Sequence, residues 1–180
     1  YSKKIEKFGY ADCPPHVTWM EPAEWLGSTK TKDYPLHLMS SQPKDRLHSQ
    51  MDGGPVSEAS KVAGREPVEI NSLDAAQRGI NPGDVVRIFN DRGQCLAGAV
   101  INDDIRPNVI RLSAGAWYDS DNGKPGCLEI HGNPNVLTRD YGTSKIGQAP
   151  TSTTALVEIE KFKESVPTLN ITSPPRQINF

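Results

Sequence analysis

Short apolar segments, each bounded by Gly, Pro, Asn or Asp, follow one another along most of this chain from residue 34 onward. Segments of this length suit β-strands, because a helix needs a longer periodic stretch to bury one face. The expected strands lie at residues 34–40, 66–72, 85–90, 94–101, 108–113 and 153–162. Short strands, tight turns and only one or two small helices predict a mainly β fold, a closed or nearly closed β-barrel with long loops.

Two short helices are expected. Residues 71–80 begin with an Asn-Ser pair that can cap free backbone N–H groups, Asp74 complements the positive helix end, and Gly79 ends the helix. Residues 21–27 predict the other, with a proline at its first position and a glycine just past its end. Between the third and fourth strands, residues 91–93 predict a tight hairpin turn.

The chain divides into three parts by composition. Residues 1–33 are rich in aromatic residues and prolines and predict an arm that packs on chain outside this sequence. Residues 34–165 form the barrel, and residues 166–180 form a tail. Because the sequence opens at Tyr1 without an initiator Met or an apolar leader, we expect it to be a fragment or a processed piece.

Composition excludes several classes of protein. A length of 180 residues suits one domain of ordinary size, and the formal net charge of −2 gives no electrostatic case for nucleic acid or an anionic membrane. No apolar run approaches the roughly 20 residues of a spanning helix. The three cysteines form no CxxC pair, so neither a disulfide framework nor a zinc site is expected, and Cys95 reads as a small core side chain.

Catalysis contained in this chain has little support from its motifs. The four histidines and the cysteines show no metal-ligand spacing. Ser49 adjoins His48, but neighbouring side chains on an extended chain point to opposite faces, which disfavours a catalytic dyad. No GxSxG, Walker or GxGxxG pattern occurs.

Two polar regions, residues 40–50 and residues 114–152, favour ligand binding instead. Their hydroxyls and amides both donate and accept, which matches the edge of a heteroaromatic ring, and Arg46 offers a planar fork suited to phosphate. As separate residues they also suit turns and solvated loops. The side chains concerned are Ser40, Gln42, Arg46, Ser49, Gln50, Asn133, Asn135, Thr138, Asp140, Ser144 and Gln148.

Four stretches of the chain, in this order, resemble the C-terminal domain of the dimethyl sulfoxide reductase family of molybdenum enzymes. They are "LHLMSSQPKDRLHSQ", the stretch from "GREPVEINS" to "RPNVIRL", "GAWYD", and "GNPNVLTRDYGTSKIGQ" with the later "TALVEIEKF". The resemblance is closest to the branch that contains trimethylamine N-oxide, dimethyl sulfoxide and biotin sulfoxide reductases. "EPAEWLG" in the arm belongs to it too, so the resemblance covers nearly the whole chain.

The resemblance implies a double-psi β-barrel that binds bis(molybdopterin guanine dinucleotide). It places Arg46 on a phosphate, His48 and Gln50 on pterin or pyrophosphate atoms, and Asn135 and Gln148 on pterin or guanine edges. The residues that match the family's two binding motifs are Ser40, Gln42, Arg46, His48, Ser49, Gln50, Asn135, Thr138, Asp140 and Gln148.

This sequence departs from the family pattern at two places. Gln42 stands where relatives commonly carry His; both can donate, so a contact survives while any proton role changes. After Gln148, "APTSTT" replaces a more usual pattern, which leaves the later contacts open.

For the longer protein, the resemblance implies oxygen-atom transfer from an S-oxide or N-oxide in anaerobic respiration. The serine that ligates molybdenum lies in an earlier domain, so no catalytic residue and no metal ligand is expected here, and the chain alone should be inactive. Implied partners are the preceding domains, a small oxide substrate and a c-type cytochrome, with neither nucleic acid nor membrane insertion. The implied compartment is the periplasm, or the cytoplasm if the protein resembles biotin sulfoxide reductase. Trp117 and Tyr118 either approach the substrate funnel or pack the barrel's edge.

Two alternatives stay open at this point. A non-catalytic double-psi barrel that recognises a protein partner would need aromatic and apolar anchors rather than these dense polar groups. A barrel resembling aspartate decarboxylase would cleave itself at a Gly-Ser bond, and Gly27-Ser28 supplies that dipeptide, although in the arm rather than in the barrel.

Overall fold

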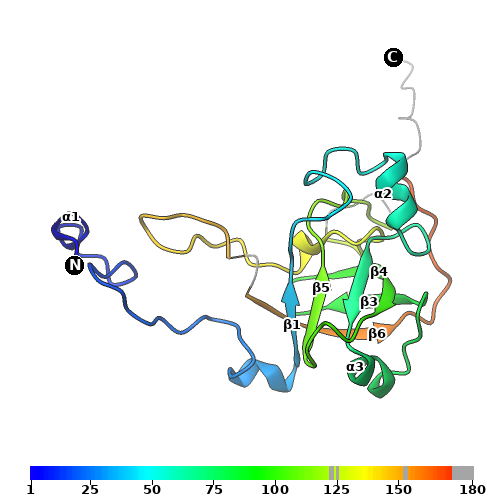
Figure 1. Cartoon of the computed structure of the whole chain (residues 1–180), viewed down its shortest axis with the longest axis horizontal. Helices are drawn as coiled ribbons and strands as arrows, with labels where there is room; N and C mark the ends of the chain where they lie inside the picture. The colour runs from blue at the N-terminus through cyan, green and yellow to red at the C-terminus, as the bar shows by residue number, and fades with distance from the viewer. Residues whose placement is uncertain (122–123, 125, 152–153, 172–180) are drawn as a thin grey trace, which may run out of the picture.

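A closed barrel forms the body of the molecule. The structure, a computed structural model, describes residues 1–121, 124, 126–151 and 154–171. Within this part, the strands are β1 (Leu36–Met39), β2 (Pro67–Ile70), β3 (Val85–Phe89), β4 (Gln94–Ile101), β5 (Val109–Leu112) and β6 (Ala155–Lys161). They close in the order β1-β5-β2-β4-β3-β6. Figure 1 shows the barrel that they form. The expectation of a mainly β, closed barrel is confirmed.

Strand direction decides where the loops leave the barrel. β1 pairs in parallel with β5, with Met39 opposite Arg111, and β2 pairs in parallel with β4. The remaining pairs are antiparallel. Because parallel neighbours end at the same edge, the polar segment after β1 and the long loop after β5 leave the barrel at one end.

The strands bury apolar side chains in a common core. On β1, Leu36 and Leu38 are fully buried, and Cys95 on β4 is buried as expected. On β6, Val157 and Ile159 point inward while Glu160 is exposed, the period of two that a half-buried strand shows. Each fully buried aliphatic side chain contributes roughly 1.5–3 kcal/mol of transfer free energy.

Two short helices precede β1: α1 (Lys3–Glu6) and the 3-10 helix η1 (Thr29–Lys32). Three more lie between strands: α2 (Pro55–Ser60), α3 (Ser72–Gln77) and the 3-10 helix η2 (Pro134–Val136). The helix predicted near residues 71–80 is α3. Its cap is Asn71, whose side chain accepts the backbone N–H of Leu73 at 3.0 Å. Gly79, at φ +63°, follows its end, as the sequence predicted.

Two local predictions were wrong. Residues 21–27 form no helix, because Glu24 in their middle is buried against the barrel, where it bonds to Arg92 and to the backbone N–H of Leu156. The sequence predicted neither a strand nor a helix for residues 51–65, but they contain α2, which starts at Pro55, a residue tolerated in the first turn of a helix.

The first residues of the chain extend away from the barrel (Figure 1). The loop at residues 141–150 extends toward the same side (Figure 1) and contacts them. There the backbone N–H of Lys145 donates to Asp12 at 2.9 Å, and the Lys145 ammonium lies over the ring of Tyr10. Among the described residues, no helix is long and apolar enough to cross a membrane.

Candidate functional site

The segments that follow β1 and β5 run against each other at the end of the barrel. The backbone N–H of Ala114 donates to the carbonyl oxygen of Ser41 at 2.9 Å. Gly115 has a φ of +93°, and a Cβ there would lie 2.2 Å from the carbonyl oxygen of His48. A residue without a side chain is therefore required at this position, on both backbone and steric grounds.

A third segment, residues 131–135, joins these two. The side-chain amide of Asn133 donates to the carbonyl oxygen of Ala116 at 2.8 Å. Nδ1 of His131 lies 2.9 Å from the carbonyl oxygen of Trp117. Because a carbonyl only accepts, Nδ1 carries the proton. The two polar regions singled out in the sequence thus meet through the loop between Ala114 and Tyr118.

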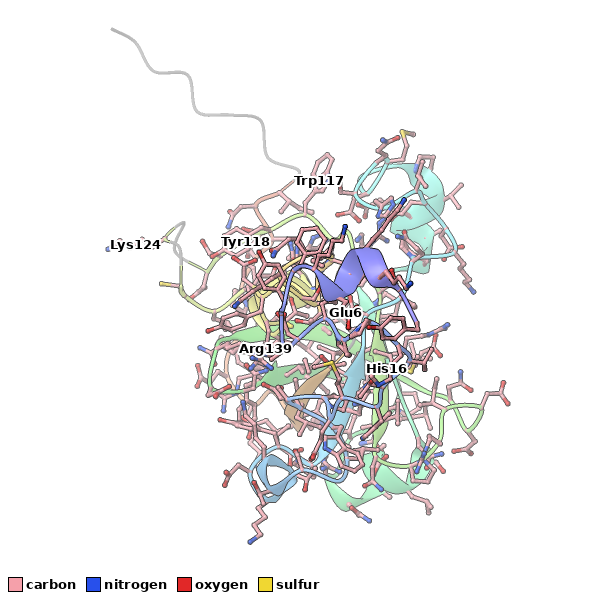
Figure 2. The ribbon with its side chains drawn as sticks, turned by 90° about the vertical axis from the view of Figure 1, so that its left-hand side faces the viewer. Glu6, His16, Trp117, Tyr118, Lys124 and Arg139 are labelled. Atoms are coloured by element: carbon pink, nitrogen blue, oxygen red, sulfur yellow. The ribbon has the colours of Figure 1, made fainter. Side chains whose placement is uncertain are left out.

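A pocket of about 450 Å³ opens where the three segments meet. Trp117 and Tyr118 are 43% and 45% exposed and lie near the end of the barrel that carries α2 (Figure 2). Two aromatic faces next to an imidazole, a hydroxyl and amides suit a planar ring with a polar edge. The lining residues are His48, Ser49, Ala114, Gly115, Ala116, Trp117, Tyr118, Asn133 and Asn135.

The structure brings together several of the predicted binding residues. His48, Ser49 and Asn135 line this pocket. Gln42 joins them indirectly, because its amide nitrogen lies 3.0 Å from Nδ1 of His48. Gln50 lines a neighbouring hollow of about 320 Å³, and Ser40 follows directly on β1.

The other predicted residues lie outside the pocket lining. Thr138 follows η2 and donates to the carbonyl oxygen of Asn135 at 3.4 Å. Asp140 is exposed beyond it. Gln148, at φ +48°, lies on the projecting loop, where its amide donates to the carbonyl oxygen of Ser144 at 2.9 Å. Their roles in binding stay predictions.

Arg46 occupies an unexpected position. Its side chain is 1% exposed, and its guanidinium lies 3.1 Å from a carboxylate oxygen of Glu66. The same group donates to the carbonyl oxygens of His48 at 3.0 Å and Ala114 at 3.1 Å. In this geometry, Arg46 ties the loop after β1 to the loop after β5. Its assignment to a phosphate stays a prediction.

Buried charges surround Arg46 and balance one another. Asp52 is fully buried and accepts the Lys61 ammonium at 2.8 Å, and Lys61 also lies 3.5 Å from Glu66. Burial by itself would raise the pKa of Asp52, but bonds from Lys61 and the backbone N–H of Trp117 hold it below its usual value. Burial raises the pKa of Glu66. Burial and the nearby charge of Lys61 lower the pKa of His131, which stays neutral.

A second buried carboxylate, Glu129, shapes the segment before Asn133. It accepts the backbone N–H groups of Asp119, His131, Gly132 and Asn133 at 2.8 to 3.2 Å. Burial raises the pKa of Glu129 to about 7, against the opposing effect of these donors. Its carboxylate organises the turn that presents Asn133 to the pocket.

Sequence reasoning missed these organising carboxylates. Asp52 stands in a polar stretch and Glu129 follows Leu128, and neither position carries a motif. Glu129 has apolar neighbours on both sides, which is the one sequence signal of its burial.

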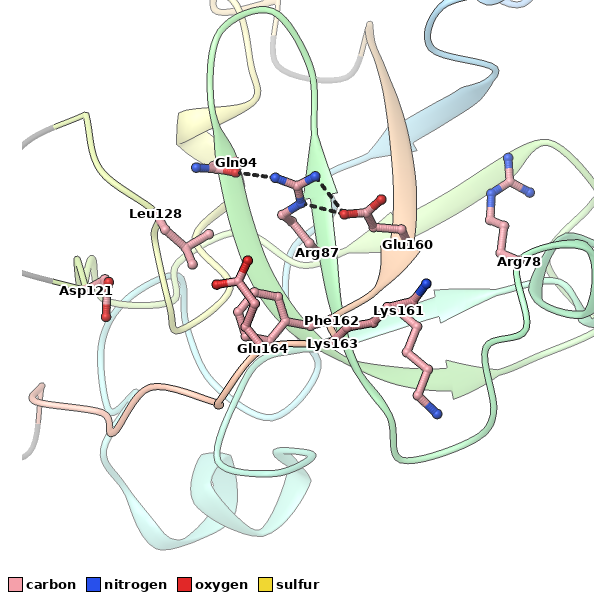
Figure 3. A pocket seen from close by; sticks show the side chains of 10 residues that line it. All are labelled: Arg78, Arg87, Gln94, Asp121, Leu128, Glu160, Lys161, Phe162, Lys163 and Glu164. Atoms are coloured by element: carbon pink, nitrogen blue, oxygen red, sulfur yellow. Dashed lines mark hydrogen bonds and ion pairs between the residues drawn. The ribbon is translucent and has the colours of Figure 1, made fainter.

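A separate hollow of about 530 Å³ lies over β3, β4 and β6 (Figure 3). Arg87 crosses it and donates to Glu160 at 2.8 Å and to Gln94 at 3.0 Å. Because these groups are bonded to one another, the hollow has the character of a solvated, charge-paired surface. None of the predicted binding residues lines it.

A closed barrel that gathers amides, an imidazole and aromatic faces at one end defines a domain for binding a large, planar and polar ligand. The chain belongs to the Molydopterin dinucleotide binding domain family, whose model matches residues 36–156. The expectation from the sequence is confirmed at this level.

Individual relatives agree with the family. The chain is 49% identical over 177 residues to the dimethyl sulfoxide/trimethylamine N-oxide reductase of Cereibacter sphaeroides, which covers 98% of this chain and 21% of that protein. It is 52% identical over 169 residues to trimethylamine-N-oxide reductase 1 of Escherichia coli strain K12, covering 92% and 20%. The chain therefore spans about a fifth of the length of these relatives.

Comparison with solved structures supports the fold. Acetylene hydratase from Pelobacter acetylenicus aligns with a TM-score of 0.73 at 18% identity, over 90% of this chain and 23% of that one. With the closed order of strands and its two parallel pairs, the chain is a double-psi β-barrel.

Proposed function

We propose that this chain is the C-terminal cofactor-binding domain of a molybdenum oxidoreductase that reduces S-oxides or N-oxides. The observation that carries the proposal is identity of 49% and 52%, over nearly the whole chain, to proteins named for dimethyl sulfoxide and trimethylamine N-oxide. The cofactor is bis(molybdopterin guanine dinucleotide). When bound, that group would supply oxygen-atom transfer chemistry, in which two electrons and two protons convert the oxygen of the oxide to water.

The donor set of the pocket fits such a group. Pterin and guanine edges alternate N–H, N and C=O, and His48, Ser49 and Asn135 offer matching donors and acceptors. Trp117 and Tyr118 offer apolar faces beside them. In this proposal, the chain binds and orients the dinucleotide and excludes water around it. The wider set of contacts comprises Ser40, Gln42, Arg46, Gln50, Thr138, Asp140 and Gln148.

The test uses the full-length enzyme. We expect the purified protein to contain molybdenum and guanine, and to oxidise a reduced viologen dye when dimethyl sulfoxide, trimethylamine N-oxide or biotin sulfoxide is added. The chain of 180 residues alone should show no turnover, since the metal ligand lies elsewhere. Absence of guanine from the full-length enzyme, or turnover by the chain alone, would contradict the proposal.

The arm and an apolar patch serve as contacts with the rest of the longer protein. Val17 and Trp19 are 104% and 79% exposed. At the barrel, Leu47, Met51 and Val56 are exposed around the hollow that Gln50 lines. Exposed apolar groups gathered in this way mark surfaces that another part of a protein covers. Trypsin should cleave the isolated chain within residues 1–33 and leave the same bonds intact in the full-length enzyme.

The longer protein works in the periplasm, with a c-type cytochrome as electron donor. Both statements rest on the resemblance to the trimethylamine N-oxide and dimethyl sulfoxide reductase branch. Cell fractionation with a cytoplasmic marker tests the compartment. Recovery in the cytoplasm would favour the biotin sulfoxide reductase type.

A further inference from the structure

Every polar group of Trp117 makes a hydrogen bond. Its backbone N–H donates to Oδ2 of Asp52 at 2.8 Å, and its carbonyl oxygen accepts from His131 at 2.9 Å. Its indole N–H donates to the carbonyl oxygen of Ser49 at 2.8 Å. The residue nevertheless stays 43% exposed and lines the pocket. Since its N–H is already used, the indole can offer a ligand only its apolar face and edge.

Asp52 links this residue to the loop after β1. Its carboxylate is fully buried, and each oxygen accepts a different hydrogen bond. Oδ2 accepts the backbone N–H of Trp117, and Oδ1 accepts the Lys61 ammonium at 2.8 Å. The Arg46 guanidinium lies 3.4 Å from the same Oδ1. Arg46 in turn donates to the carbonyl oxygen of His48. One carboxylate therefore joins both walls of the pocket, although it does not line the pocket itself.

We propose that Asp52 is a positioning residue that fixes Trp117 in the pocket wall, so that the indole stacks on a planar ring of the bound dinucleotide. This inference rests on the proposed function and adds to it the aromatic face and the residue that holds that face. Stacking of a base on an aromatic side chain contributes roughly 1–3 kcal/mol. Two backbone hydrogen bonds and one from the indole N–H hold Trp117, so the residue loses little conformational freedom when the ligand arrives.

The test compares two buried aspartates in the full-length enzyme. Asp52→Asn turns one carboxylate oxygen into an amide donor, so either Trp117 or Lys61 loses its acceptor. Asp74→Asn is the matched control. Asp74 is 2% exposed and accepts the backbone N–H of Asn108 at 2.7 Å. It lies on α3, at the opposite end of the barrel from α2 (Figure 1).

Two readouts separate positioning from general stability. The first is the rate at which guanine dinucleotide leaves the enzyme in mild urea; we expect Asp52→Asn to raise it about tenfold and Asp74→Asn to leave it unchanged. The second is the ¹⁹F resonance of 5-fluorotryptophan at position 117, assigned by its loss in Trp117→Phe. We expect Asp52→Asn to shift or broaden this resonance and Asp74→Asn to leave it in place.

Trp117 variants keep the proposal testable if Asp52→Asn does not fold, because the ring is half-exposed and tolerates change. Trp117→Phe retains an aromatic face and should release the dinucleotide more slowly than Trp117→Ala. Equal release from wild type and Trp117→Ala overturns the inference, as does an unchanged ¹⁹F resonance in Asp52→Asn. If the wild-type enzyme contains no guanine dinucleotide, the proposed function itself fails, which is a different result.

Discussion

The carboxylate of Glu129 accepts the backbone N–H of Asn133 at 2.8 Å, four residues further along the chain. This bond ties a fully buried charge to the residue whose side-chain amide holds the loop after β5. The other oxygen of Glu129 accepts from Asp119 and His131. The shape of one pocket wall thus depends on a carboxylate that never reaches the pocket.

Glu129→Gln should destabilise the chain most clearly at pH 5. Burial raises the folded pKa of Glu129 to about 7, so wild type itself loses stability as pH rises from the ordinary pKa of 4.5 through 7. One oxygen becomes an amide nitrogen, which faces two backbone N–H groups that then lack an acceptor. We expect the free energy of unfolding to fall by roughly 2 kcal/mol or more, measured in urea. Glu58→Gln, at an exposed position on α2, should change it by less than about 0.5 kcal/mol. Equal values for the two variants would contradict the assigned role.

Gly115→Ala should lower the free energy of unfolding much more than Gly83→Ala does. The two glycines have similar φ angles of +93° and +87°, so the backbone strain of an added side chain is nearly the same. Only at Gly115 does a Cβ meet another atom, the carbonyl oxygen of His48 at 2.2 Å; nothing lies within 4 Å of a Cβ at Gly83. We expect the free energy of unfolding to fall by about 1 kcal/mol in Gly83→Ala. It should fall by at least about 2 kcal/mol more in Gly115→Ala. Equal losses of unfolding free energy in the two variants would show that the loops after β1 and β5 can move apart without destabilising the fold.

Much of the barrel was predictable because its signals are local. Strands such as β3 and β4 alternate apolar and polar side chains or run apolar between turn residues, and the Asn71 cap is read directly from sequence. The failure at residues 21–27 has the opposite cause. Glu24 finds its partners in Arg92 and in Leu156, 132 residues away, and no local propensity encodes that contact.

The candidate site also combines features that the local sequence predicts with features that depend on contacts between distant residues. His48, Ser49 and Asn135 stood out as polar groups in unusual density, and they do line one pocket. No motif marks Asp52 or Glu129 in the sequence, because burial of a charge depends on tertiary partners such as Lys61. The family resemblance predicts the binding motifs, while the network of buried charges around them appears only in three dimensions.

Glu24 makes the contact between arm and barrel sensitive to acid. Burial by itself would raise its pKa, but bonds from Arg92, the Leu156 N–H and Lys30 outweigh burial and lower the pKa to about 2. A depressed folded pKa stabilises the protein above the unfolded value of 4.5 and loses that effect as pH falls toward 2. The difference in unfolding free energy between wild type and Glu24→Gln should shrink by up to about 3 kcal/mol between pH 6 and pH 2. A difference that is constant with pH would contradict this account.

Arg46→Lys distinguishes two roles of Arg46, which are to link the loops after β1 and β5 and to bind a phosphate. A lysine keeps the charge and can still bind phosphate, but one ammonium cannot replace the fork that reaches Glu66 and the carbonyl oxygens of His48 and Ala114 together. We therefore expect the chain without cofactor to lose about 1–3 kcal/mol of unfolding free energy. Arg106→Lys, at an exposed position, is the control and should change it by less than about 0.5 kcal/mol. If Arg46→Lys leaves the cofactor-free chain as stable as wild type and only lowers the guanine content of the full-length enzyme, Arg46 acts on the phosphate and the tie is secondary.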